Sequence, residues 1–350
     1  MTGGEHGADR VVRIGQVGVG YWGKNLLRNF SRLPSAEVVS ACDQREAILQ
    51  SVAAGYPGMQ TISDFDALLQ DDSIEAIVVA TETPTHAELA EKALLAGKHV
   101  FVEKPLAQSV EDAQRLVELS EERGLVLMVG HLLIYHPAFR YVDALIETGG
   151  LGDVYYLYSS RVNLGVIRQK ENALESLAPH DLAVSLRFLK RRPVAVAAQG
   201  QAYLQPGVED VAFATVFFED GRIAHLHTSW LDPHKIRKVT VVGSRRMAVI
   251  DDMQTVEKVR LYDKGVEMAS GQESYANYAE SMSIRVGDIR IPKIEMQEPL
   301  RAECMHFVDC IRRGLTPETD GRDGLAVVSM IDAMQRSLRS DGARVNLKDD

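Results

Sequence analysis

Three glycines near the beginning of this 350-residue chain have the spacing of a dinucleotide-binding loop. Gly18, Gly20 and Gly23 follow an apolar run at residues 11–17, which reads as a buried strand, and precede a helical pattern that begins at Lys24. In this context the glycines permit a tight turn, close approach of the backbone to a pyrophosphate and close packing of the helix on the strand. We expect the phosphates at the helix N-terminus, where backbone N–H groups and the helix dipole favour negative charge.

Asp43 favours NAD as the cofactor. It ends a second apolar run at residues 37–42 and lies 20 residues after Gly23, where a carboxylate can accept hydrogen bonds from both hydroxyls of an adenosine ribose. The same carboxylate would repel a 2′-phosphate, which disfavours NADP. Arg45 follows closely; it could meet a 2′-phosphate or lie in solvent at the start of the next helix, and both readings stay open.

Lys104 is the residue for which the sequence predicts a role in proton transfer. It lies in the triplet Glu103-Lys104-Pro105, directly after an apolar run at residues 99–102. Hydride transfer from a secondary alcohol requires loss of the hydroxyl proton, and a lysine in a partly desolvated pocket can have a pKa low enough to exchange that proton. The alternative is a surface lysine that pairs with Glu103, and the spacing alone favours neither.

The elements that position these residues alternate between strand and helix. Further apolar runs at residues 75–81 and 125–129 read as strands, and helices are expected at 87–96 and 110–123. This rhythm predicts a doubly wound parallel sheet, a Rossmann domain, over residues 11–130. Ligands bind at the carboxyl ends of such strands, where the sequence places Thr81, Pro84, His86, Glu103 and Lys104.

Beyond His131 the pattern changes to successive strands with tight turns. It predicts an α+β domain with a large, mostly antiparallel open sheet over residues 131–350, and a disordered N-terminus at 1–10. Residues 265–298 are expected to be irregular, followed by two helices at 301–313 and 324–338. Another helix is expected at 182–189, with Asp181 as a possible cap.

The overall composition excludes several classes of partner. A net charge of -10 disfavours nucleic acid and anionic membranes, and the chain has no apolar run of membrane-spanning length and no apolar signal region. We therefore expect a cytoplasmic protein. The three cysteines and ten histidines show no metal-ligand spacing, so no metal site is expected.

The chain resembles the glucose-fructose oxidoreductase / inositol dehydrogenase / MocA family of NAD(P)-dependent sugar and cyclitol dehydrogenases. Strings in the second domain resemble a branch whose members act on nucleotide sugars, including UDP-N-acetylglucosamine 3-dehydrogenases. The likeness covers nearly the full chain, and the Glu103-Lys104-Pro105 triplet is its most specific marker. The residues that carry it are the strings at 18–23, 80–86, 103–105, 161–165, 177–181, 229–233, 241–244 and 298–304.

The resemblance implies a catalytic site with Lys104 at the reacting sugar hydroxyl and His180 opposite it as a proton-transfer partner. It also implies that the sheet of the second domain covers the site and forms a homodimer or homotetramer. One position departs from the pattern: many relatives have an aspartate four residues before the histidine, where this chain has Ser176. Lys104 and His180 could suffice, Glu175 or Asp181 could replace the missing carboxylate, or turnover could be lost.

The remaining candidate residues are assigned to the cofactor or to the sugar substrate. Tyr21 and Trp22 are expected beside the cofactor pyrophosphate. Arg161, Asn163 and Arg168 could hold sugar hydroxyls or a diphosphate, because arginine offers a planar fork of donors, or they could be strand-end residues in water. Together with Tyr135, which lines the nicotinamide pocket or packs at a hinge, the predicted substrate-binding set is Lys104, Tyr135, Arg161, Asn163, Arg168, Ser176, His180 and Asp181.

Taken with these residues, the resemblance implies NAD-dependent oxidation of a ring hydroxyl of a nucleotide-linked hexose. UDP-glucose or UDP-N-acetylglucosamine would be oxidised at C3 to a keto sugar used in amino sugar biosynthesis. Three alternatives remain: a dehydrogenase of a free cyclitol or monosaccharide, a keto-sugar reductase, and a non-catalytic sensor of dinucleotide and sugar.

Overall fold

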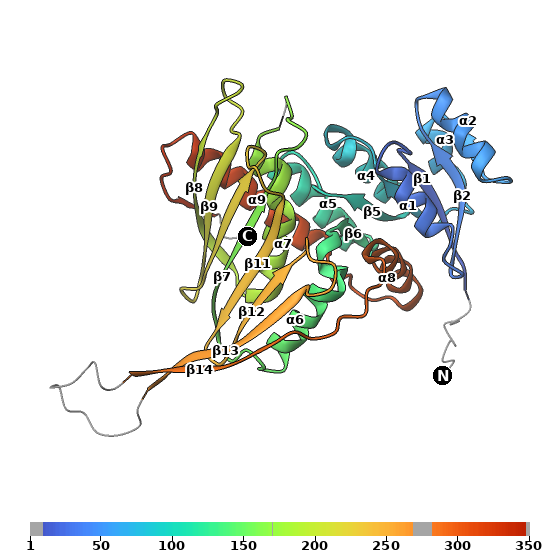
Figure 1. Cartoon of the computed structure of the whole chain (residues 1–350). Coiled ribbons are helices and arrows are strands. Elements are labelled where there is room, and N and C mark those ends of the chain that lie inside the picture. Colours follow the sequence, from blue (N-terminus) through green and yellow to red (C-terminus); the bar gives the residue numbers. More distant parts are fainter. Residues whose placement is uncertain (1–9, 170, 269–281, 348–350) are drawn as a thin grey trace. The chain divides into compact units, whose positions relative to one another are not determined.

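The computed structural model describes residues 10–169, 171–268 and 282–347, drawn in colour in Figure 1. The predicted disordered N-terminus lies outside the described residues except for Arg10. The chain divides into two compact units, Met1–Tyr135 with Gln297–Ser329 and His136–Met296 with Met330–Asp350. The prediction that the second domain runs unbroken from 131 to 350 is therefore corrected. Residues 297–329 join the first unit because side chains such as Phe307 and Val328 pack in its core.

The first unit contains a sheet of six parallel strands in the order β3-β2-β1-β4-β5-β6. The predicted doubly wound parallel sheet is thus confirmed, with β3 as a short edge strand that the sequence reading did not include. The strands are β1 (Val12–Val17), β2 (Ala36–Cys42), β3 (Gln60–Ile62), β4 (Ala76–Val79), β5 (His99–Glu103) and β6 (Leu127–Gly130). The helices are α1 (Gly23–Phe30), α2 (Glu46–Gly55), α3 (Phe65–Leu69), α4 (His86–Leu95), α5 (Val110–Glu122) and α8 (Pro299–Arg313), with 3-10 turns η1 (Thr83–Thr85) and η2 (Leu132–Tyr135).

Helices cover both faces of this sheet. On one face, Phe30 of α1, Phe101 of β5 and Phe307 of α8 form a cluster of edge-to-face rings with centroids 5.7 to 6.2 Å apart. On the other face, α4 and α5 pack through buried alanines and leucines such as Ala93 and Leu116. Burial on both faces explains why β4 reads as an uninterrupted apolar run.

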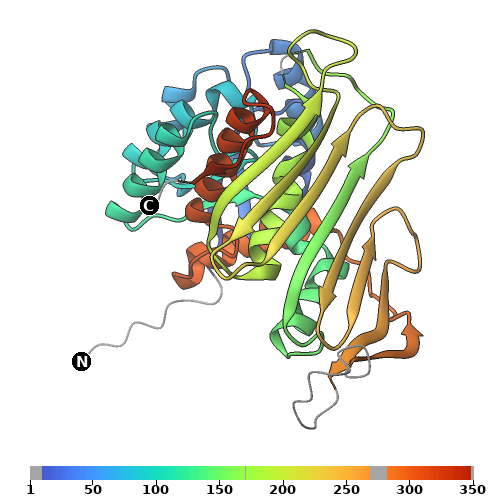
Figure 2. The same ribbon diagram turned by 90° about the vertical axis from the view of Figure 1, so that its left-hand side faces the viewer.

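The second unit contains a nine-stranded sheet in the order β14-β13-β12-β11-β7-β10-β9-β8-β15. Only β7 and β10 pair in parallel, so the predicted large, mostly antiparallel sheet is confirmed. The strands are β7 (Val154–Val162), β8 (Pro193–Gln201), β9 (Val211–Phe218), β10 (Ile223–Ser229), β11 (Ile236–Gly243), β12 (Met247–Asp251), β13 (Val259–Met268), β14 (Met282–Arg290) and β15 (Val345–Asn346). Figure 2 shows this sheet from the side that no described helix of the unit covers.

Two segments of this unit differ from the sequence prediction. The stretch expected to be irregular, residues 265–298, is partly ordered, because residues 265–268 of β13 pair antiparallel with β14. Residues 269–281 of that stretch lie outside the described residues. The predicted helix at 182–189 is longer: α7 (Ala173–Leu189) begins at Asn172, whose side chain and that of Glu175 form a capping box. The expected cap, Asp181, lies within α7, and Pro179 also lies inside the helix.

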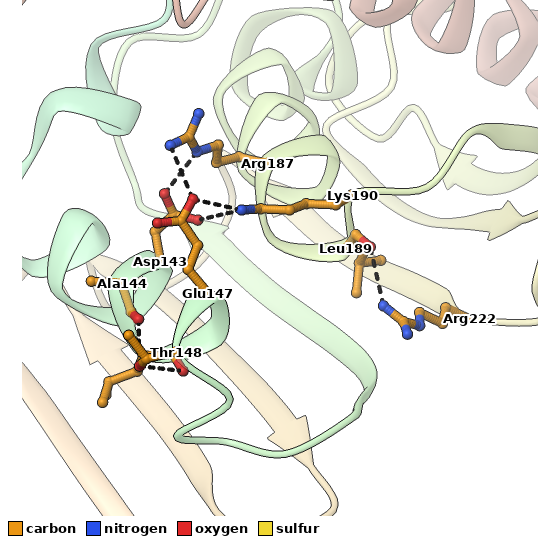
Figure 3. A network of polar contacts seen from close by, with 9 residues as sticks. Asp143, Ala144, Glu147, Thr148, Arg187, Leu189, Lys190 and Arg222 are labelled. Atoms are coloured by element: carbon orange, nitrogen blue, oxygen red, sulfur yellow. Dashed lines mark hydrogen bonds and ion pairs between the residues drawn. The ribbon is translucent and has the colours of Figure 1, made fainter.

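Ion pairs join α7 to the neighbouring helix α6 (Pro137–Glu147), as Figure 3 shows. Arg187 donates to Asp143 at 2.7 Å, and Lys190 donates to Glu147 at 2.7 Å. Lys190 ends α7 with φ 49°, a left-handed conformation that is uncommon for lysine. These contacts hold α7, which carries His180, against α6. The final helix α9 (Gly321–Leu338) begins in the first unit, and its last residues belong to the second.

Candidate active site

The glycine-rich loop folds back against the end of β4, and two of its glycines have no room for a side chain. Gly18 has φ 85°, and a Cβ atom there would lie 2.6 Å from the backbone of Ala80. A Cβ atom on Gly23 would lie 2.1 Å from the carbonyl oxygen of Gly18. The loop can therefore make its tight turn only with glycine at these two positions.

The N-terminus of α1 is suited to an anion. No acidic residue lies in its first turn, and the side chain of Trp22 at the N-cap position does not cap it. Tyr21 and Trp22 are 87% and 38% exposed on this loop, while Gly20 is partly buried. The helix dipole and this loop fit the pyrophosphate of a dinucleotide, in agreement with the fingerprint.

Asp43 lies at the end of β2 beside the loop. Its carboxylate accepts hydrogen bonds from the backbone N–H of Val19 at 3.0 Å and from the Arg45 guanidinium at 2.9 and 3.0 Å. Burial alone would raise the pKa of Asp43, but these donors outweigh it and hold the pKa below its ordinary value. Arg45, which is mostly exposed, reaches over the loop, and its Nη2 lies 3.1 Å from the Cβ position of Gly20. The end of β2 beside the loop thus contains an anion and a cation together.

His86 joins the two loops that follow β4 and β5. Its Nδ1 lies 2.8 Å from the carbonyl oxygen of Pro105, and its Nε2 lies 3.2 Å from that of Thr81. The ring is 1% exposed, and burial lowers the pKa of His86, which favours the neutral form. His86 thus fixes these two loops relative to each other, and its predicted contact with the cofactor stays a prediction. Thr81 is partly exposed and accepts from Thr85 at 2.7 Å, while Pro84 is exposed in η1.

Glu103 and Lys104 lie at the carboxyl end of β5. The Glu103 carboxyl accepts a hydrogen bond from the indole N–H of Trp22 and another, at 3.2 Å, from the backbone N–H of Lys104. Burial raises the pKa of Glu103 to about 7, although Trp22 and the positive charge of Lys104 oppose the shift. The cofactor loop is thus bonded directly to the residue beside Lys104. The carboxyl end of β5 thus contains a carboxyl group with a pKa near neutrality and, beside it, the partly exposed Lys104.

In the second unit, Arg161 of β7 and Asp181 of α7 form a buried ion pair. The Nε and Nη2 atoms of Arg161 each donate to one carboxylate oxygen of Asp181 at 2.9 Å, and the two side chains are 9% and 2% exposed. Asp181 therefore does not cap a helix, which corrects that expectation. The pair fastens the middle of α7 to the sheet. This structural engagement leaves neither group free for the sugar contact that the sequence suggested.

Ser176 and His180 lie four residues apart on α7, so they share one face of the helix. Both are partly exposed. Asn163 directly follows β7 and its backbone N–H donates to the carbonyl oxygen of Ser229 at 3.1 Å. Arg168 is exposed in the same loop and lies 3.5 Å from Glu171. Ser176, His180, Asn163 and Arg168 thus remain accessible candidates on the second unit.

Tyr135 is a packing residue. Its ring is 1% exposed, and its hydroxyl lies 3.1 Å from that of Thr319. These contacts give Tyr135 a packing role, and its predicted contact with the ligand stays a prediction. Its neighbour His136 instead caps α6 by accepting from the backbone N–H of Ala138.

Sequence reasoning missed two buried polar groups of the first unit, His131 and Glu303. His131 follows β6, is 1% exposed, and has its pKa lowered to about 3 by burial and by the charge of Lys104. Glu303 lies on α8 and is 0% exposed. The signal for Glu303 was present, because it is four residues before Phe307 on the apolar face of an amphipathic helix. Within the part of the chain that is described, no group of three or more His, Cys, Asp or Glu side chains could hold a metal, and no helix is long and apolar enough to cross a membrane.

Comparison with known proteins agrees with this geometry. UDP-N-acetylglucosamine 3-dehydrogenase of Acidithiobacillus ferrooxidans is 26% identical over 319 residues, covering 91% of this chain and 94% of that protein. A solved structure of that enzyme has a TM-score of 0.78 at 25% identity and covers 94% of this chain and 98% of its own. The NAD-dependent scyllo-inositol 2-dehydrogenase of Bacillus subtilis is 24% identical over 319 residues, covering 88% of this chain and 86% of that protein.

Two family profiles match the chain in succession. One, described as an oxidoreductase family with an NAD-binding Rossmann fold, matches residues 12–131. The other, described as the GFO/IDH/MocA C-terminal domain, matches residues 139–249. The family resemblance seen in the sequence is confirmed, and the chain belongs to the GFO/IDH/MocA family as an NAD-binding oxidoreductase.

Proposed function

We propose that this protein is a dehydrogenase that oxidises a ring hydroxyl of a nucleotide-linked hexose, at C3 of a sugar such as UDP-N-acetylglucosamine or UDP-glucose. One observation carries the proposal: the glycine-rich loop is hydrogen-bonded through Trp22 to Glu103, the residue beside Lys104. A cofactor loop and a candidate proton acceptor are thereby joined at one edge of the parallel sheet. A relative similar over nearly the whole of both chains is named for oxidation of UDP-N-acetylglucosamine at C3.

The chain's own residues supply binding and proton transfer. Gly18 to Gly23 and the N-terminus of α1 hold the pyrophosphate, and Asp43 binds the adenosine ribose once its carboxylate exchanges Arg45 for the ribose hydroxyls. When bound, NAD supplies the hydride acceptor. Lys104 accepts the proton of the reacting hydroxyl, and His180 of the second unit assists this transfer.

The substrate is held by accessible groups of the second unit. We propose that Ser176, on the same face of α7 as His180, donates or accepts one hydrogen bond with a sugar hydroxyl. Asn163 and the exposed Arg168 bind the sugar and the diphosphate. This assignment gives the phosphate-binding role to Arg168, because Arg161 is already engaged by Asp181.

A second candidate function is oxidation of a free cyclitol. The similarity to a scyllo-inositol 2-dehydrogenase is nearly as extensive. Engagement of Arg161 in the buried pair also leaves Arg168 as the one proposed arginine ligand for a diphosphate. A cyclitol carries no diphosphate and would not require it.

The outer face of the nine-stranded sheet is proposed as the contact between copies of this chain in a homodimer or homotetramer. Strand register places Tyr158 of β7 beside His225 of β10, with Phe213 of β9 stacked on His227 at 4.4 Å. Tyr158 and Phe213 are 43% and 45% exposed. A contiguous aromatic surface over three adjacent strands is typical of an interface. Light scattering should give a multimer for the native chain and a smaller species for Phe213→Glu.

The activity is tested by NADH formation from NAD with UDP-N-acetylglucosamine, UDP-glucose, glucose 6-phosphate, myo-inositol and scyllo-inositol, each with a trap for the carbonyl product. We expect turnover with a UDP-sugar and little with the unactivated rings. Turnover with the inositols alone would contradict this proposal and favour oxidation of a free cyclitol. Binding of NAD without turnover of any sugar would favour a sensor of dinucleotide and sugar.

A further inference from the structure

Glu303 is a carboxylic acid enclosed in the core of the first unit, and the mechanism above does not use it. It lies one turn from the start of α8 and is 0% exposed. An ionised carboxylate in such a place costs several kcal/mol unless it is paired and hydrogen-bonded. Neither carboxyl oxygen of Glu303 has a hydrogen-bond partner among the described residues. A buried acid without a hydrogen-bond partner is rare in native proteins, which indicates a functional or electrostatic role for Glu303.

Packing of α8 on β5 directs Glu303 toward Glu103. Phe101 and Glu103 are two residues apart on β5 and share one face of the sheet, while Glu303 and Phe307 are four residues apart and share one face of α8. The rings of Phe101 and Phe307 are in contact, with centroids 5.7 Å apart. Glu103 is the next residue after Phe101 on that face of β5, and Glu303 is one helical turn before Phe307 on α8. Both carboxyl groups are therefore neighbours of the contact between the two rings. The negative charge of Glu103 accordingly acts on Glu303.

The space around Glu103 is restricted. A Cβ atom at Gly130, on the adjacent strand β6, would lie 3.1 Å from its Oε2. Trp22 and the backbone N–H of Lys104 donate to its two oxygens. Glu103 is partly exposed and Glu303 is not, so the pair extends from the site into the core.

The other titratable groups near the pair do not compensate a charge on Glu303. Glu298, at the start of α8, is paired with Arg28 of α1. Cys304 is buried, and burial raises its pKa well above the ordinary value, so the thiol is neutral. His131, after β6, is neutral because of its low pKa.

Two neighbouring carboxyl groups in a desolvated site do not both ionise near neutral pH. Glu103 accepts two hydrogen bonds and has the positive charge of Lys104 nearby, whereas Glu303 has neither. The single negative charge therefore resides on Glu103. Burial and the charge of Glu103 raise the pKa of Glu303 well above its ordinary value, in agreement with this distribution.

We propose that Glu303 is a positioning residue that keeps its proton at working pH and, as a neutral dipole behind Glu103, sets the proton affinity of the Lys104 amine. The role in turnover rests on the proposed function, whereas the protonation of Glu303 does not. An ionised Glu103 is the counter-charge that favours the ammonium form of Lys104. A protonated Glu303 favours the ionised Glu103, and an apolar residue in its place would favour the neutral Glu103.

The protonation state is tested without any substrate, by infrared spectroscopy of the folded protein at about pH 8. We expect a carbonyl band of a protonated carboxylic acid in the native chain. The band should be lost in Glu303→Gln and retained in Glu103→Gln. Identical carbonyl bands in the native chain and Glu303→Gln would overturn the proposal, even if no sugar is ever found that the protein oxidises.

The effect on Lys104 is tested with Glu303→Gln and Glu303→Leu, which both remove the acid while only glutamine retains a dipole. In the pH profile of kcat/KM, the Glu303→Gln variant should have the same acidic limb as the native chain. In the Glu303→Leu variant the acidic limb should lie about one pH unit lower, because Lys104 loses part of its counter-charge. Thermal unfolding of both variants reports any loss of fold. Two results would contradict the proposed role. One is a pH profile of kcat/KM for Glu303→Leu that equals the native profile. The other is an equal loss of kcat in Glu303→Gln and Glu303→Leu without any shift of the acidic limb.

Discussion

Arg161 and Asp181 are joined by two hydrogen bonds of 2.9 Å across the interface of β7 and α7, and both side chains are almost completely buried. The sequence suggested both as ligands of the sugar, Arg161 for its planar fork of donors and Asp181 as a possible replacement for the carboxylate missing at Ser176. Their mutual engagement changes that assignment. The pair fixes the helix turn that contains His180, while Ser176 and His180 occupy an accessible face of the same helix.

Breaking this pair should be costly. Asp181→Asn leaves the buried Arg161 guanidinium without its counter-charge, and we expect a loss of about 3–5 kcal/mol in the free energy of unfolding. Urea denaturation measures it. The matched control is Glu121→Gln, which breaks the exposed pair with Arg322 and should cost about 0–1 kcal/mol. A loss below 1 kcal/mol for Asp181→Asn would show that the buried pair does not hold α7.

Lys104→Ala should lower kcat by about 10²–10⁴, because proton transfer from the reacting hydroxyl loses its acceptor. The Kd for NAD should stay within about threefold of the native value, since the pyrophosphate loop is untouched. Steady-state kinetics and fluorescence titration measure the two quantities. Lys92→Ala, which removes an exposed lysine of α4 paired with Glu88, is the control and should leave both unchanged. An unchanged kcat in Lys104→Ala would refute the mechanism.

Asp43 and Arg45 should have opposite effects on cofactor choice. Asp43→Ala removes the acceptor for the ribose hydroxyls, and we expect the Kd for NAD to rise about tenfold or more. Arg45→Ala should weaken binding of NADP and leave NAD binding nearly unchanged, because the guanidinium is the available partner for a 2′-phosphate. Calorimetric titration of each variant with both cofactors checks this. Glu46→Gln, in the exposed first turn of α2, serves as the control.

The close approach at Gly23 predicts a sharp contrast between two glycines that both lie at helix ends. Gly23→Ala would place Cβ 2.1 Å from the carbonyl oxygen of Gly18, so the loop must shift, at a cost of about 1–3 kcal/mol and with weaker NAD binding. Gly55→Ala, at the end of α2, meets no atom within 4 Å and should be neutral or stabilising by up to about 1 kcal/mol. Chemical denaturation and NAD titration compare the two, and similar effects would contradict the loop geometry.

Asp252 should contribute a pH-dependent stability. A hydrogen bond from His136, 3.4 Å away, and the charges of Lys258 and Arg237 lower the pKa of Asp252 to about 2. A depressed carboxyl pKa stabilises the fold above the unfolded-state value of about 3.9, and this stabilisation is lost as the pH falls from about 4 to about 2.

Asp252→Asn should therefore lose about 1–2 kcal/mol near pH 6, and its unfolding free energy should fall less than that of the native chain between about pH 4 and pH 2. Denaturant titrations at several pH values measure the difference. Glu257→Gln, which breaks the exposed pair with Arg260, is the control and should retain the native pH dependence. Parallel curves for Asp252→Asn and the native chain would rule out the predicted contribution.

The sequence by itself determined the features that depend on local pattern. Gly18, Gly20 and Gly23 between a strand and a helix, and Asp43 after the next strand, specified the dinucleotide-binding unit, because turn geometry and apolar periodicity are properties of short segments. The successive strands and tight turns beyond His131 likewise indicated the open antiparallel sheet. Lys104 was identified for the same reason, since its position follows directly from the end of β5.

The tertiary structure decided the features that depend on contacts between distant segments. Arg161 and Asp181 were expected to bind the sugar, but the packing of α7 on β7 pairs them with each other. The helix expected at 182–189 begins at Ala173, because a capping box at Asn172 starts α7 earlier. Glu303 is 200 residues from Glu103, and only the return of α8 to the first unit brings its carboxyl toward β5. Such pairings arise from side-chain burial across the fold, which the order of residues along the chain does not reveal.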